Sequence, residues 1–412
     1  MDTVTSGDAV TSGDAVRSGD AVRSGDAGTA GDAGSAVGAC RELARTLAEH
    51  AADVDRRARF PEEGVRGLRS AGLLAAAAPA RLGGPGADVP TLAEMASALA
   101  RGCGATAMIW AMQQVQLACL APGEDDPRLG AEVEAIVREQ RLVASVTSEA
   151  GVGGDLRTSR CAVEPGADGP PGEAGPTYRL VKHATTVSYG PQAGAFLVSA
   201  RRAPGADPGD QVAVLLAADR TEREVTGPWD SLGMRGTCSP PMRLSGGFEG
   251  WRVLSRPFAE IVERAMTPLA HVLWSAVWLG LAAEAADRAV AWSRRRAAGG
   301  PAPSPGVAEV RWRLAAARAQ LTEAAGRADA VLAGTAAPTV GFAVEMNSLK
   351  LAASESAVQV ALGALRVCGM AGYAETGPYS VARIVRDLLS APLMIGNDRL
   401  AAANATLALM SR

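Results

Sequence analysis

The sequence predicts an α+β protein in which a helical N-terminal region, a central β module and a larger helical region follow one another along the chain. Apolar residues recur at spacings of three and four from Ser35 to about residue 141, and again from Phe258 onward, which is the period of a buried helix face. Between residues 142 and 257, short runs such as YRLVKHATTVSY alternate with Gly- and Pro-rich clusters, which favours antiparallel strands. Neither a βαβ repeat nor a GxGxxG motif after a strand is present, so a Rossmann domain is not expected.

Length and composition limit the class of protein. At 412 residues the chain exceeds the roughly 250–300 residues at which a single core divides. The net charge of −3 and a pI of about 5.8 provide no basic field for nucleic acid or an anionic membrane. No run of about 20 apolar residues predicts a membrane span, and no basic segment followed by a hydrophobic one predicts secretion. A cytoplasmic protein is therefore expected.

Cysteine and histidine usage argues against a disulfide framework or a metal site. The 6 cysteines are scattered without CxxC spacing, as expected of free thiols in a reducing compartment. Only 3 histidines occur, His50, His183 and His271, and they are too dispersed to predict a metal centre.

The chain begins with a repeat. Residues 5–34 consist of the hexapeptides TSGDAV, TSGDAV, RSGDAV, RSGDAG and TAGDAG. A period of six can indicate a β-helix, but these small, polar and glycine-rich turns could not bury a core. Residues 1–34 are therefore predicted to be a disordered tail.

The helical regions carry recognisable start signals. In the first, FPEEGVRGLRSAGLL places Pro61 and two acidic residues at a helix start, and VPTLAEMASALARGCGATAMIWAM is helical throughout. In the second, amphipathic stretches cover residues 258–297, 307–334 and 340–369, and the segment GGPAPSPG separates the first two. A bundle of long helices is predicted.

Neither a Walker loop nor a GxSxG elbow is present in the sequence. The candidate functional residues lie instead in three other stretches. SEAGVGGD (148–155) turns on glycines and exposes backbone N–H groups. TVSYGPQAGAFLVSA (186–200) starts a strand with Thr186 and Ser188 on one face. VCGMAGY (367–373) follows a long helix and allows close approach of a phosphate. Each stretch could also be a simple turn, and together they favour a protein whose cofactor performs the chemistry.

In this order and at this chain length, the three stretches resemble the acyl-CoA dehydrogenase family over residues 36–412. The resemblance implies an N-terminal helical domain (35–141), a central β-barrel domain (142–257) and a C-terminal four-helix bundle (258–412). It also implies FAD held between the β domain and the bundle, and a homotetramer or homodimer in which a second subunit completes the FAD site.

Several flavin and substrate contacts follow from the resemblance, residue by residue. In the first turn Ser148 is assigned to the cofactor, and Gly154 stands where the family has a serine that contacts the substrate. The Trp-Ile-Thr segment of the family is similar to Thr186-Val187-Ser188 here. Ser188 keeps the hydroxyl donor to flavin N5, whereas the indole is lost at Thr186. Arg235, in WDSLGMRGTCS, matches a segment assigned to substrate.

The pyrophosphate of FAD is assigned to the last stretch. Arg366 replaces the family's glutamine and could pair with phosphate itself, and Gly369 and Gly372 match two of its glycines. Arg296, in SRRR, is expected to reach the FAD of a neighbouring subunit. Asn397 is also assigned to the cofactor.

The family's catalytic base has no counterpart. Counting from Arg386-Asp387 in VRDLLSAPLMIGNDRL places Ile395 where the family has the glutamate that takes the α-proton. The alternative base site of other members falls near Ala270. His271, one residue away, is the candidate substitute, although it could equally be a packed helix histidine. Asp398 and Glu263 are two further candidates for the base. Asp398 could instead only cap a helix, and Glu263 could be one of many charges on a solvated helix face.

Three functions stay open from the sequence. The first is FAD-dependent α,β-dehydrogenation of an acyl thioester, of coenzyme A or of an acyl carrier protein, with a nonstandard base and a separate electron acceptor. The second is a monooxygenase on the same fold that takes reduced flavin from a flavin reductase and needs no α-proton base. The third is a flavin-free structural or carrier-binding protein.

Overall fold

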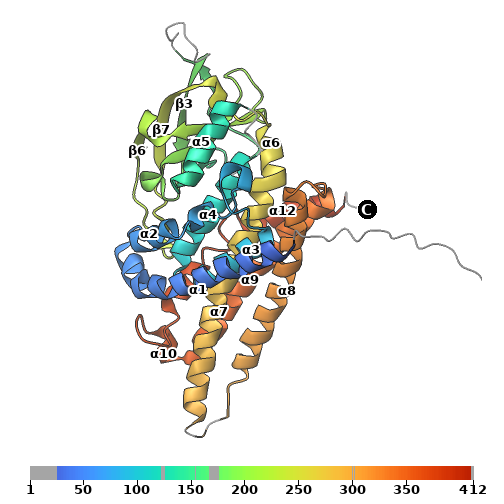
Figure 1. Cartoon of the computed structure of the whole chain (residues 1–412). Helices are drawn as coiled ribbons and strands as arrows, with labels where there is room; N and C mark the ends of the chain where they lie inside the picture. The colour runs from blue at the N-terminus through green and yellow to red at the C-terminus, as the bar shows by residue number, and fades with distance from the viewer. Residues whose placement is uncertain are drawn as a thin grey trace, which may run out of the picture.

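A computed structural model describes residues 26–121, 126–153, 155–166, 176–298, 300 and 302–409. Its three regions are stacked along one axis (Figure 1). The β module forms one end, the N-terminal helices cross the middle, and the long C-terminal helices form the other end. The predicted order of helices, strands and helices, and with it the fold class, is confirmed.

The described residues of the N-terminal region are mostly helical. Its α-helices are α1 (Asp26–Arg57), α2 (Glu62–Ser70), α3 (Val89–Gly102), α4 (Gly104–Leu120) and α5 (Pro127–Arg138). Helix α1 begins ahead of the predicted boundary at Ser35, so residues 26–34, expected in a disordered tail, are helical instead. Extending an existing helix is far easier than nucleating one, and alanine recurs in this stretch. The remainder of the predicted tail, residues 1–25, lies outside the described residues.

The β module contains two sheets. Its strands are β1 (Val143–Val146), β2 (Glu164–Pro165), β3 (Thr177–Ala184), β4 (Ala195–Arg201), β5 (Gln211–Ala217), β6 (Thr221–Val225) and β7 (Met242–Glu249). One sheet has the order β1-β4-β5 and the other β2-β3-β7-β6. The expectation of purely antiparallel strands is wrong for one pair, because β1 is parallel to β4. The chain between them passes through β2 and β3 of the other sheet, which supplies the long connection that a parallel pair requires.

The C-terminal region is built on one long apolar helix. Its elements are α6 (Phe258–Ile261), a π-helical segment (Val262–Met266), α7 (Thr267–Ala297), α8 (Gly306–Leu332), α9 (Val340–Cys368), α10 (Met370–Tyr373), α11 (Ala382–Leu388) and α12 (Asn397–Ala408). Helix α7 packs against α3, α4, α8 and α9.

Two helical stretches are long and apolar enough to cross a membrane by length and composition, 258–297 and 340–368. The apolar window of the first is 89% buried inside the fold, and that of the second is 39% buried. Composition alone does not separate a buried core helix from a spanning one. The first, at least, has the burial expected of a core helix.

We call the segment between α11 and α12 the strap. The Arg-Asp pair just before the strap, Arg386 and Asp387, joins all three regions. Arg386 binds Asp55 of α1 through two hydrogen bonds of 2.9 and 2.7 Å. Asp387 is buried and accepts a 2.7 Å hydrogen bond from the Met234 backbone N–H of the β module. A Cβ at Gly233 would lie 2.0 Å from the Arg386 carbonyl oxygen, so this close approach requires glycine. The pair therefore fixes the strap to the other two regions.

The burial of Asp387 predicts a pH-dependent contribution to stability. Desolvation raises the pKa of Asp387 to about 6, although the Arg383 charge and the Met234 N–H lower it. A carboxyl group with a raised folded-state pKa stabilises the fold below its unfolded pKa of about 3.9, and this contribution is lost as the pH rises through about 6. Asp387→Asn removes the ionisation and keeps an acceptor for the N–H. We expect the stability of wild type relative to this variant to fall by about 1–3 kcal/mol between pH 4 and pH 7, measured by urea denaturation. A difference that does not change with pH would contradict the assignment.

Candidate functional site

The turn after β1 and the segment before β4 are held together by hydroxyl and backbone groups. Ser148 Oγ donates to the Thr186 carbonyl at 2.8 Å and accepts from the Thr186 N–H at 3.1 Å. Val187 is buried and anchors the segment, whereas Thr186 is exposed. The two stretches that the sequence singled out, around Ser148 and Ser188, therefore form one surface.

A chain of three hydroxyl groups ends on this surface. Ser239 Oγ donates to Ser188 Oγ at 2.9 Å and lies 2.9 Å from Thr237 Oγ1. Because Ser188 accepts from Ser239, its own hydroxyl proton is available to a ligand. Ser188 therefore has the hydrogen-bonding capacity of the predicted flavin donor. Sequence reasoning missed Ser239, although this residue ends the stretch WDSLGMRGTCS in which Arg235 was singled out.

A buried ion pair between Glu149 and Lys182 anchors the turn after β1 to strand β3. Glu149 accepts 2.9 and 2.8 Å bonds from Lys182 Nζ and Ser159 Oγ, and further bonds from the N–H groups of Arg160 and Cys161 at 3.1 and 2.7 Å. Burial by itself would raise the pKa of Glu149, but Lys182, Ser159 and the Arg160 N–H outweigh it and lower that pKa. Lys182 also donates to the Ser199 carbonyl at 2.9 Å. Sequence reasoning missed this network, although a lysine on the inward face of β3 was a signal for it.

The strap meets the same turn. Arg399 of α12 donates to the Ile395 carbonyl at 2.7 Å and to the Gly153 carbonyl at 3.1 Å, so it bridges the two segments. Ile395 has a φ of 64°, which is unfavourable for a β-branched residue and indicates strain in the strap. Gly154, predicted to face the substrate, lies outside the described residues. The structure thus brings the strap to the turn, and the strap carries Ile395 at the position of the family's catalytic glutamate.

His271 does not lie on this surface. Its side chain is buried between α7 and α9, and Nδ1 lies 3.1 Å from the Met346 carbonyl, to which it can donate. Burial lowers the pKa of His271 to about 4, with the Lys350 charge acting in the same direction. The structure therefore favours the packed-histidine interpretation over the expectation that His271 replaces the base. The other two candidates, Asp398 and Glu263, are exposed.

Asn397 is occupied by contacts within the bundle. Its side-chain oxygen accepts a 2.6 Å bond from Lys350 Nζ, and its amide nitrogen donates to Ser354 Oγ at 3.1 Å and to Glu355 Oε1 at 2.7 Å. Lys350 is fully buried against Trp278, and desolvation lowers its pKa to about 8. Asn397 thus ties α12 to α9, which differs from its predicted contact with the cofactor. Lys350 carried no sequence signal.

Arg235, predicted to contact substrate, ties its loop to α1. Its guanidinium donates to the Asp55 carbonyl at 2.9 Å and to the Ser231 carbonyl at 2.7 Å. The side chain is 26% exposed, so one edge still faces solvent. Its contacts in this chain are structural.

The remaining predicted residues lie at the opposite end of the molecule. Arg366, Gly369 and Gly372 surround α10, which lies far from β3 and β7 in Figure 1. Gly369 has a φ of 56° and a ψ of −138°, a conformation that essentially only glycine adopts. Arg366 and Arg296 are exposed, and so are Met370 and Tyr373 of α10. One chain therefore does not bring these residues to Ser148, Thr186 and Ser188.

Comparison with known proteins identifies the family of this chain. Two family models match, the acyl-CoA dehydrogenase N-terminal domain over residues 37–124 and the C-terminal domain over residues 259–406. The chain belongs to the acyl-CoA dehydrogenase family, which is a family of flavoenzymes. The predicted resemblance is confirmed.

The relatives differ in the reactions their names state. The probable acyl-CoA dehydrogenase FadE25 of Mycobacterium tuberculosis is 26% identical over 374 residues, 88% of this chain and 91% of that protein. The amino sugar nitrososynthase DnmZ of Streptomyces peucetius is 28% identical over 359 residues, 84% of this chain and 86% of that protein. The FMN-bound structure of TdsC from Paenibacillus sp. A11-2 matches with a TM-score of 0.79 at 22% identity, covering 92% of this chain and 98% of that one. A flavin cofactor is supported, and the family contains more than one chemistry.

Proposed function

We propose that this chain is a flavin-dependent oxygenase that uses reduced flavin and O2 to insert one oxygen atom into a small organic substrate. The second oxygen atom leaves as water, and the two electrons required come from a separate flavin reductase. Reduced flavin, when bound, would supply those electrons at the site.

The observation that carries the proposal is the missing base. Dehydrogenation of an acyl thioester needs a group that takes the α-proton within hydrogen-bond reach. Ile395 cannot accept a proton, Ala270 is a buried methyl group, and His271 is enclosed between α7 and α9. Oxygen insertion needs no such group.

The surface around Ser148 and Ser188 is the proposed site of the flavin ring. The Ser188 hydroxyl proton is available because Ser239 donates to its oxygen. The Ser148 contact to Thr186 fixes the distance between the turn and the segment, and Glu149 holds the turn rigidly from below. Thr186 is small and exposed where the family has a tryptophan, which leaves space beside the flavin for a substrate and O2.

We further propose FAD as the form of the flavin and a homo-oligomer as the active species. Arg296, Arg366 and Gly369 are exposed and Gly372 is buried next to Gly369, in a part of the bundle where an FAD bound to a second subunit could place its pyrophosphate. The exposed Met370, 78% accessible in one chain, and Tyr373 suit a subunit contact. The similarity to DnmZ supports a non-dehydrogenase reaction, because its name states an amino sugar nitrososynthase.

Two parallel assays test the proposed reaction. In the first, oxidised protein is mixed anaerobically with acyl-CoA thioesters of short, medium and long chains, and flavin absorbance is followed. We expect no bleaching, because Ile395, Ala270 and the enclosed His271 cannot take the α-proton. In the second, the protein receives NADH, a flavin reductase, indole as a probe and ¹⁸O2, with the reductase alone as control. A product carrying one ¹⁸O atom is expected, whereas rapid bleaching by any thioester would establish dehydrogenation instead.

A further inference from the structure

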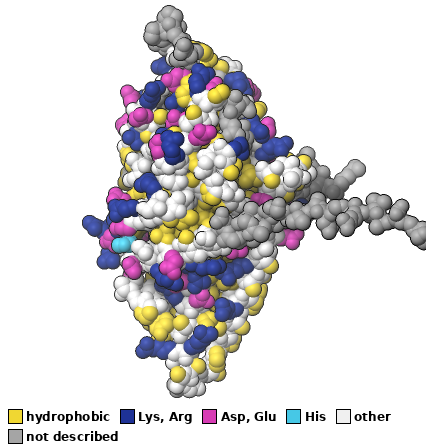
Figure 2. Space-filling model, in the orientation of Figure 1, with side chains coloured by type: hydrophobic (Ala, Val, Ile, Leu, Met, Phe, Trp, Pro, Cys, Tyr) yellow, Lys and Arg dark blue, Asp and Glu magenta, His cyan; other side chains and the backbone are white. Residues whose placement is uncertain are grey.

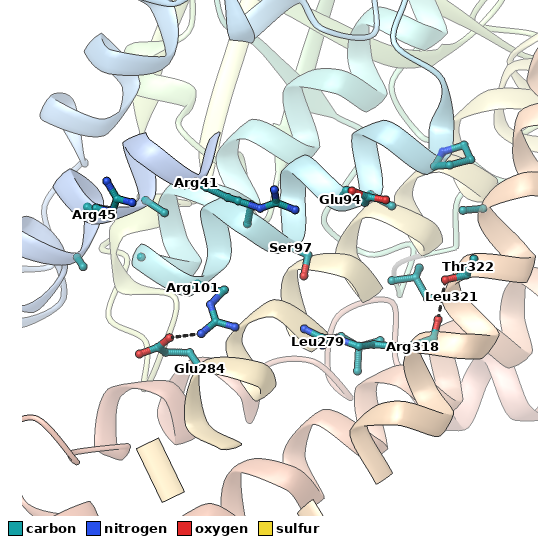
Figure 3. Close-up of a pocket in the computed structure, with 17 residues that line it drawn as sticks. Arg41, Arg45, Glu94, Ser97, Arg101, Leu279, Glu284, Arg318, Leu321 and Thr322 are labelled. Carbon is teal, nitrogen blue, oxygen red and sulfur yellow. Dashed lines mark hydrogen bonds and ion pairs between the residues drawn. The ribbon is translucent and has the colours of Figure 1, made fainter. Parts of the chain in front are cut away.

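A second concave site lies away from the surface around Ser148. It is a groove with a volume of about 720 Å³ between α1 and α8, with α3 and α7 at its base (Figure 3). This volume falls within the roughly 300–1,000 Å³ of small-molecule sites. None of the residues that line it is assigned to the flavin or to the strap. The groove therefore does not belong to the site described above.

The groove has an apolar base. Ala93, Ala98, Leu279 and Ala325 line it and are all buried. Ser97 presents a hydroxyl group between the two walls. Such a base suits an aliphatic or aromatic portion of a ligand, because apolar surface gains free energy when it leaves water.

The walls are positively charged in a protein whose net charge is negative. Four arginines line the groove (Arg41, Arg45, Arg101 and Arg318) against two carboxylates (Glu94 and Glu284), which leaves two positive charges in excess. The whole chain carries −3. On the face shown in Figure 2, Lys and Arg side chains gather just below the level of α1, with acidic side chains between them.

Two of these arginines lack a counter-ion. Arg101 is paired with Glu284 at 3.2 Å and with Asp287 at 2.7 Å, and Arg45 with Glu42 at 2.9 Å. Across the part of the chain that the structure describes, no carboxylate lies within 4.0 Å of the Arg41 or Arg318 guanidinium groups. Figure 3 shows these two side chains reaching into the groove from opposite walls. Burial and the neighbouring Arg101 and Arg311 charges lower the pKa of Arg318, against the opposing effect of Asp287.

We propose that this groove binds an amphipathic small-molecule oxyanion, whose carboxylate or phosphate group lies between Arg41 and Arg318 and whose apolar portion covers the base. A guanidinium group matches the planar geometry of carboxylate and phosphate and remains charged even when partly desolvated. The concave shape and the volume of about 720 Å³ favour a small molecule over a protein partner. This inference does not depend on the reaction proposed for the flavin site.

Calorimetric titration of the flavin-loaded protein tests the site. The probes are octyl phosphate and octanoate, with octanamide as the uncharged control. Saturable binding of at least one anion, weakened by added NaCl, is expected together with little binding of the amide. Arg41→Gln and Arg318→Gln should each weaken anion binding by about tenfold, since each removes a charge-assisted hydrogen bond.

Matched control variants show whether the two unpaired arginines themselves hold the anion. Arg45→Gln should leave the affinity unchanged, because Arg45 is already paired and points to solvent. The double variant Arg41→Gln/Arg318→Gln should keep the flavin spectrum, the melting temperature and the oligomeric state of wild type. Unchanged anion affinity in the double variant, or no saturable binding of either anion, would overturn the proposal. A change of oligomeric state in the double variant would also overturn it, by showing that the groove is a subunit contact.

Discussion

Replacing Glu149 with glutamine will lower the free energy of unfolding by about 3–5 kcal/mol, because Lys182 then remains charged and buried without a counter-ion. The two side chains are 6% and 1% exposed and lie 2.9 Å apart, so water cannot replace the lost carboxylate. The amide also places a donor among groups that already donate, namely Ser159 Oγ and the N–H groups of Arg160 and Cys161. Urea denaturation at pH 7 measures the loss.

Two variants serve as controls for this prediction. Glu149→Gln/Lys182→Met removes both charges and should recover more than half of the loss, since the penalty comes from the unpaired ion. Glu164→Gln breaks the exposed Arg179–Glu164 pair, which is 2.7 Å long, and should cost about 0–1 kcal/mol. If Glu149→Gln were as mild as Glu164→Gln, the buried pair would not support the turn.

Ile395→Glu should create thioester-driven flavin reduction at least about 100-fold faster than wild type, which is the lower range for general-base catalysis. The substitution restores a carboxylate at the position of the family's base, on a strap that Arg399 holds against the turn at Gly153. It also replaces a β-branched residue at a φ of 64°, so the backbone should tolerate it. Anaerobic rapid mixing with acyl-CoA thioesters measures the rate.

The uncharged Ile395→Gln variant separates basicity from size and should resemble wild type. Above about pH 5 the new carboxyl group is ionised, so the gain should diminish as the pH falls below that value. His271→Gln in the Ile395→Glu background should leave the rate unchanged, because His271 is buried against the Met346 carbonyl. Equal rates in wild type and Ile395→Glu with a reactive thioester would show that another group is already the base.

Local patterns in the sequence predicted the order of the three regions. A period of three and four marks a helix wherever it packs, and β-rich runs between Gly and Pro clusters mark strands. The same reasoning could not predict that β1 runs parallel to β4, because that depends on where the intervening β2 and β3 pair. It also placed the start of α1 too late, since the repeat composition in residues 26–34 masked an extension of the helix.

Motif resemblance grouped the residues of the candidate site only in part. The structure joins the segments that carry Ser148, Thr186, Ser188 and Ile395. Residue spacing alone was enough to predict that position 395 lacks the family's carboxylate. Arg366 and Gly369 lie at the end of α9 beside α10, far from the β module. The order of motifs along a sequence does not state whether the motifs lie together within one chain.

The sequence by itself determined which side chains are present, namely the hydroxyl groups at Ser148 and Ser188 and an isoleucine at the position of the family's base. Only the tertiary structure decided what those side chains do. His271 became a packed, neutral histidine because α9 covers it, and Lys182 became the partner of Glu149 because β3 lies beneath the turn. Arg41 and Arg318 line one groove because α1 and α8 face each other across α3 and α7. Burial and charge pairing depend on neighbours in space that are tens or hundreds of residues apart in the chain, whereas periodicity and spacing report only on neighbours in sequence.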